Sequence, residues 1–134
     1  MNEATLKDIG YLILRLGLGA IMARHGWPKI IGGTQMWTDV GGGMSVIGIT
    51  FFPAFWGFCA AVAEFGGGIC VALGILHRPA CGLIVFTMLV AFLNGFGGTH
   101  TFNDWNHPAE LGVAFFAMLL MGPGRFSLSV SLNK

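Results

Sequence analysis

The stretch AFWGFCAAVAEFGGGICVALGIL, residues 54–76, decides the fold class of this protein. It holds one ionisable side chain, Glu64, and it exceeds the roughly 20 apolar residues that cross the hydrocarbon core of a bilayer. A carboxylate near the middle of such a segment is normally paired, protonated or functional, because an isolated charge in hydrocarbon is expensive. The segment also carries a stripe of small residues, which predicts that Glu64 faces a closely packed helix. The members of this stripe are Gly57, Ala60, Ala61, Gly67, Gly68 and Gly74.

Three further apolar segments lie at about residues 9–26, 80–96 and 105–121. We therefore predict an all-α, polytopic membrane protein in which four transmembrane helices form one domain over residues 1–134. The first segment is expected to be retained, because Arg15 interrupts it and no good signal-peptide cleavage site follows.

Composition supports the membrane class. Hydrophobic residues make up 54% of the chain, charged residues 10%, and the mean hydropathy is +0.74. A soluble domain of this size needs about 25% charged residues to cover its surface. The net charge of +1, without any basic run, argues against a nucleic-acid partner.

The region between the first two segments is predicted to be a long external loop, residues 29–53, because Pro28 should end the first helix. Its apolar part, residues 37–52, is expected to lie in the membrane interface or to re-enter the membrane.

Lysine and arginine counts predict the orientation. The side that holds both termini carries Lys7, Arg78, Arg125 and Lys134, whereas the opposite side carries Arg24 and Lys29. The excess favours both termini in the cytoplasm.

Two groups of polar residues are candidates for chemistry. The first is Glu64 with a basic partner from the first helix, where Arg24 or His25 is expected to approach it from the external side. Arg15 is expected either to reach Glu64 from the cytoplasmic side or to satisfy a backbone carbonyl. Glu64, Arg15 and His25 are therefore the predicted catalytic residues, although a purely structural buried pair is the alternative.

The second group gathers at the external ends of the predicted helices. It comprises His25, Lys29, His100, Asp104, His107 and Glu110. These side chains are interpreted either as interfacial polar residues in water or as a proton path or quinone headgroup contact, with Arg24, Lys29, Glu110 and His107 as the cofactor-binding candidates. No metal-ligand spacing is present, so no metal site is predicted.

Several motifs together resemble the DoxX family of small bacterial membrane proteins. They are Leu14-Arg15-Leu16-Gly17, His25-Gly26-Trp27-Pro28-Lys29, Ala63-Glu64-Phe65-Gly66-Gly67-Gly68, Leu73-Gly74-Ile75-Leu76 with Arg78, and Gly122-Pro123-Gly124-Arg125-Phe126-Ser127-Leu128. The resemblance implies a four-helix bundle in the inner membrane of a bacterial cell, linked to oxidoreductase complexes, with polar positions at Arg15, His25, Lys29, Glu64 and Arg125. The chain lacks a cysteine pair for dithiol chemistry, so a thiol-relay role is not expected.

Three functions remain open at this stage. The chain is a quinone-interacting membrane subunit associated with an oxidoreductase, a non-catalytic anchor or scaffold of a larger membrane complex, or a small transporter. The lipid bilayer and either protein partners or further copies of the chain are the expected partners. The sequence does not identify a cofactor, and a quinone is the candidate under the first of the three functions.

Overall fold

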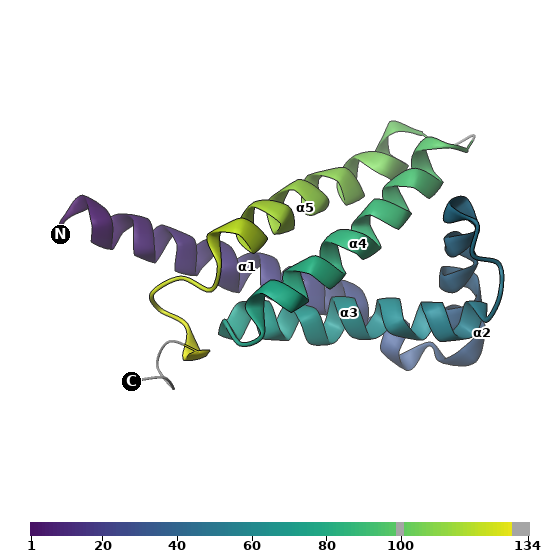
Figure 1. Ribbon diagram of the computed structural model, residues 1–134, viewed down its shortest axis with the longest axis horizontal. Helices are drawn as coiled ribbons and strands as arrows, with labels where there is room; N and C mark the ends of the chain where they lie inside the picture. Colours follow the sequence, from purple (N-terminus) through teal and green to yellow (C-terminus); the bar gives the residue numbers. More distant parts are fainter. Residues whose placement is uncertain (99–100, 130–134) are drawn as a thin grey trace.

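The computed structural model describes residues 1–98 and 101–129, and this part of the chain is helical without any strand. Its elements are α1 (Glu3–Ile31), α2 (Gly33–Gly41), the 3₁₀ helix η1 (Gly42–Ile47), α3 (Pro53–Leu73), α4 (His77–Phe96) and α5 (Phe102–Met121). The predicted all-α class is confirmed. The four long helices alternate in direction, and the start of α1 and the end of α5 lie toward the same end of the molecule (Figure 1).

The first helix is longer than expected at both ends. Pro28 was expected to stop it, and this expectation is wrong, because α1 contains Pro28 and continues to Ile31. The physical reason is position: a proline within the last turn removes one backbone hydrogen bond, and little helix remains beyond it to be disrupted. The direction of the chain changes only after Gly32, where Gly33 adopts a positive φ of 73°.

The predicted long loop after α1 is mostly helical. α2 and η1 together occupy residues 33–47, and only residues 48–52 separate η1 from α3. Gly48, with φ of 85°, closes η1, and Pro53 opens α3 at a position where a missing N–H is tolerated.

α3 is the central helix, since it contacts α1, α2 and α4, while α5 packs on α4. The short turn at residues 74–76 joins α3 to α4, and the two helices diverge from that turn toward the end where α2 and η1 lie (Figure 1). We call this the α2 end of the bundle, and we call the opposite one the terminal end.

Glycines bring α1 and α3 into close contact. A Cβ atom added at Gly19 would lie 2.7 Å from the carbonyl oxygen of Gly68, and one added at Gly68 would lie 2.6 Å from the carbonyl oxygen of Gly19. A Cβ atom added at Gly26 would clash with the backbone nitrogen of Phe65 and would lie 2.9 Å from the carbonyl carbon of Glu64. The expectation that the small residues of α3 face neighbouring helices therefore agrees with the packing: Gly68 meets α1, Gly57 meets Trp37 of α2, and Gly67 meets Ile84 of α4.

α3 and α4 expose much of their apolar surface. Both are long and apolar enough to cross a membrane, with mean hydropathies of 1.6 and 1.9 over their most apolar stretches. Only 33% and 28% of those stretches are buried within the chain. A core helix of a soluble protein would be mostly buried, so these exposed apolar faces require an apolar environment.

Candidate functional site

A buried ion pair joins α1 to α3. Lys29 Nζ donates to both carboxylate oxygens of Glu64, at 2.7 and 2.8 Å. Glu64 is 1% exposed, whereas the side chain of Lys29 is 28% exposed. The carboxylate thus has a charged partner that satisfies both of its oxygens, as burial in an apolar bundle demands.

The local sequence explains why Lys29 reaches Glu64. Gly26 lets the α1 backbone lie directly against residues 64–65, and Lys29 follows one turn later, beyond Pro28. The indole Nε1 of Trp37, on α2, donates to the carbonyl oxygen of Lys29 at 2.7 Å. The last turn of α1 is therefore held in place by both of its neighbouring helices.

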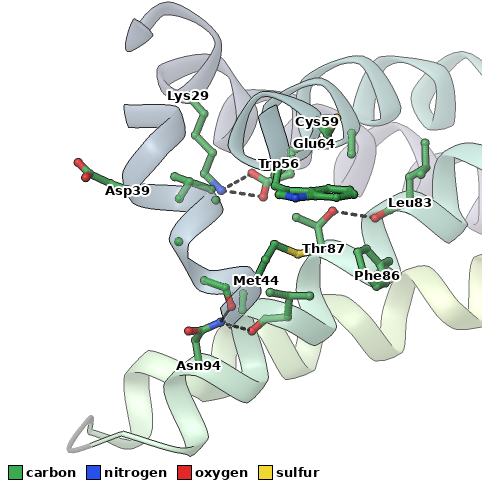
Figure 2. A pocket seen from close by; sticks show the side chains of 18 residues that line it. Lys29, Asp39, Met44, Trp56, Cys59, Glu64, Leu83, Phe86, Thr87 and Asn94 are labelled. Atoms are coloured by element: carbon green, nitrogen blue, oxygen red, sulfur yellow. Dashed lines mark hydrogen bonds and ion pairs between the residues drawn. The ribbon is translucent and has the colours of Figure 1, made fainter. Parts of the chain in front are cut away.

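The ion pair lines a cavity of about 670 Å³ between α3, α4 and the α2–η1 segment. Figure 2 shows Lys29 and Glu64 at one side of it and Trp56, Thr87, Leu83 and Phe86 along the rest. The cavity is lined by Lys29, Asp39, Val40, Gly41, Gly42, Gly43, Met44, Trp56, Cys59, Ala60, Ala63, Glu64, Leu83, Phe86, Thr87, Val90, Ala91 and Asn94. A mostly apolar wall with a few convergent polar groups is typical of a binding site for a small organic molecule.

Asn94 ties α4 to the segment that covers this cavity. Its amide Nδ2 donates to the carbonyl oxygen of Gly43 in η1 and to that of Val90, both at 2.8 Å. Sequence reasoning missed Asn94, although a lone amide at the end of an uncharged apolar segment was a usable signal. It also missed Asp39, Met44, Trp56 and Cys59, because their convergence depends on where α2 and η1 pack.

Arg15 lies elsewhere, at the terminal end of the bundle. It is 2% exposed, and its guanidinium donates to the carbonyl oxygens of Ala72, Pro123 and Phe126. Its donors are directed to these carbonyls, so the expectation that it reaches Glu64 is not met. The other expectation, that Arg15 donates to backbone carbonyls, agrees with these three hydrogen bonds.

Arg24 and His25 do not line the cavity. They line a separate hollow with Ala20, Ile21 and Pro28. The expected pairing of either side chain with Glu64 is wrong, because α1 continues through Pro28 and places Lys29, rather than these residues, beside the carboxylate.

His25 instead meets His107 of α5, with 3.2 Å between their Nε2 atoms. Both residues are exposed, so this contact lies at the surface of the bundle. Glu110 accepts from the amide of Asn106 at 2.7 Å, and Asp104 accepts from the backbone N–H of Thr101 in a capping box at the start of α5. His100 lies outside the described residues. Among the members of the expected external cluster that the structure describes, Lys29 alone lines the cavity.

Long helices with exposed apolar side chains, two of them joined by a buried ion pair, place this chain in the class of helical integral membrane proteins. The sequence profile of the DoxX family matches residues 10–97. The chain is also 31% identical to the inner membrane protein YqjF of Escherichia coli (strain K12) over 134 residues, which covers 96% of each protein. The chain belongs to the DoxX family, as the motifs indicated. No solved structure matches it.

Proposed function

We propose that this chain is a four-span protein of the bacterial inner membrane that binds the headgroup of a lipid-soluble quinone against Lys29 and Glu64, as the membrane subunit of an oxidoreductase. The observation that carries the proposal is the buried Lys29–Glu64 pair on the wall of an otherwise apolar cavity of about 670 Å³. That volume falls within the range of about 300–1,000 Å³ common for organic ligands.

Helix length supports the four spans. α1 has 29 residues, α3 has 21, and α4 and α5 have 20 each, and 20 residues rise about 30 Å, the thickness of the hydrocarbon core. Outward-facing apolar side chains continue onto α1 and α5, where Ile13 is 66% exposed and Val113 is 73% exposed. The name of the Escherichia coli relative supports the inner membrane, and the lysine and arginine bias supports cytoplasmic termini.

The charges of the cavity select against an anionic ligand. Two carboxylates, Glu64 and Asp39, and one ammonium, Lys29, are its charged lining groups. A phosphate or fatty-acid headgroup would be repelled by this excess of negative charge, whereas a neutral headgroup would not. A quinone carbonyl oxygen can accept from Lys29, and Glu64 can exchange a proton with the reduced hydroxyl. The electrons would be supplied by a partner protein.

Intrinsic fluorescence gives a direct test, because Trp56 lines the cavity and quinones quench tryptophan. Titration of the purified protein with a short-chain quinone is expected to give saturable quenching. Glu64→Gln and Lys29→Met are each expected to weaken binding by about tenfold or more, the loss expected for a charged hydrogen bond. Arg24→Gln is the matched control, since Arg24 does not line this cavity. Quenching that does not saturate, or that is unchanged in Glu64→Gln, contradicts the proposal.

The alternative function is that of a purely structural anchor subunit, and the packing of α3 removes one argument for it. Small residues on a membrane helix can mark the face on which a partner helix docks, but Gly68 packs against α1 and Gly57 against α2 of this chain. A stoichiometric partner that copurifies with a quinone-free protein would favour this alternative.

A further inference from the structure

Apolar side chains of α3 and α4 form one side of the cavity. We propose that the ligand enters between α3 and α4 directly from the hydrocarbon layer, and that its apolar tail remains in this opening while its headgroup contacts Lys29 and Glu64. This inference deepens the proposed function, because it requires a membrane-dissolved ligand and excludes a water-soluble one.

Three residues that line the cavity are also exposed on the outer surface of the bundle. Leu83 is 57% exposed and Phe86 48%, both on α4, and Cys59 on α3 is exposed as well. They lie within the two helices that are apolar enough to span a membrane. A side chain that borders both the cavity and the lipid-facing surface marks a place where the two communicate.

The α2 end of the cavity is covered. Met44 of η1 lines the cavity at 7% exposure, and η1 is held to α4 by the hydrogen bond from Asn94 to Gly43. Gly41 packs against the backbone of Pro53 and Gly57, so α2 lies tightly on α3. An amphiphile therefore meets less obstruction between α3 and α4, which diverge from their connecting turn (Figure 1).

The side chains along the opening suit a ligand that has a polar headgroup and an apolar tail. At one side stand Lys29 and Glu64, which bind polar atoms, and at the other stand Leu83 and Phe86, which favour a hydrocarbon chain. A polar metabolite would have to cross lipid to use this entrance, whereas a tailed molecule is already dissolved there.

Cys59 allows the entrance to be tested without any ligand. A protein with Cys70→Ala and Cys81→Ala retains Cys59 as its one thiol, which can be labelled with a bimane fluorophore and reconstituted into vesicles. The label is expected to lose fluorescence when brominated phospholipids replace ordinary ones, and to be insensitive to aqueous iodide. In a cysteine-free protein, Val113→Cys on α5 is the lipid-facing control, and Glu3→Cys near the N-terminus is the water-facing control.

Quenching by iodide as strong as at Glu3→Cys, with no effect of brominated lipid, would overturn the lateral entrance. If labelling at Cys59 disturbs folding, Leu83→Cys in the cysteine-free protein reports on the opposite wall of the same opening. Since neither measurement uses a quinone, the entrance can be established while the quinone titration fails, or rejected while that titration succeeds.

Discussion

At the scale of single residues, the Glu64 carboxylate and the Lys29 ammonium stabilise each other inside the bundle. Glu64 has no other hydrogen-bond partner among the contacts described, so its two oxygens depend on Lys29. Removing one member of a buried pair leaves the other as an uncompensated charge, which is more costly than removing both.

This asymmetry predicts a mutant cycle. Lys29→Met is expected to destabilise the protein by about 3 kcal/mol, the low end for a buried pair because Lys29 is partly exposed. The double variant Lys29→Met, Glu64→Leu is expected to recover most of that loss. Thermal unfolding in detergent measures both effects, and additive losses in the double variant would show that the two charges do not depend on each other.

Arg15 gives a second prediction at this scale, at the opposite end of the bundle. Arg15→Met is expected to lower the stability by at least about 2 kcal/mol, because three carbonyl oxygens lose a charged donor. Residues 122–126 should then be released and become sensitive to protease, while quinone binding by the folded protein is unchanged. Protease resistance equal to that of the native protein would contradict the role given to Arg15.

At the scale of elements, the contact between α1 and α3 depends on the positions of individual glycines. A Cβ atom at Gly68 would lie 2.5 Å from the backbone nitrogen of Ala23, whereas one at Gly66 would meet only Val62 of its own helix, at 4.0 Å. The two positions lie two residues apart in one helix and therefore form a matched pair.

Gly68→Ala is expected to separate α1 from α3 and to destabilise the protein, because backbone atoms cannot move aside as flexible side chains can. Gly66→Ala is expected to be neutral or to stabilise by up to about 1 kcal/mol through helix propensity. Unfolding temperatures of the two variants compare them directly, and equal temperatures would contradict the proposed helix contact.

The elements also show what the sequence could predict. The predicted segments 54–76, 80–96 and 105–121 lie close to the bounds of α3, α4 and α5, whereas the predicted segment 9–26 falls short of α1 at both ends. The lone Glu64 marked the buried charge. The partner of Glu64 was misassigned, because Pro28 was expected to end α1 and Lys29 was therefore placed in a loop. The rise per residue along the helix then favoured Arg24 and His25 as the partners of Glu64. In the structure both line a separate hollow, and His25 contacts His107.

At the scale of the whole molecule, the cavity had no sequence signature. It exists because α3 and α4 diverge from a short turn and because α2 and η1 pack across the space between them (Figure 1). Asp39 of α2, Trp56 and Glu64 of α3, and Asn94 of α4 come from three different helices, and no periodic pattern links them. The packing between helices decides which side chains converge, and only the three-dimensional structure contains that information.

The central claim is that a neutral headgroup binds to the Lys29–Glu64 pair from within the membrane. A structure determined in a lipid nanodisc supplemented with quinone tests this most directly. The account predicts ring-shaped density within hydrogen-bond distance of Lys29 Nζ and Glu64, continuing as a tail between α3 and α4 past Phe86. A cavity filled only by protein side chains, with the ion pair sealed from any ligand, would contradict it.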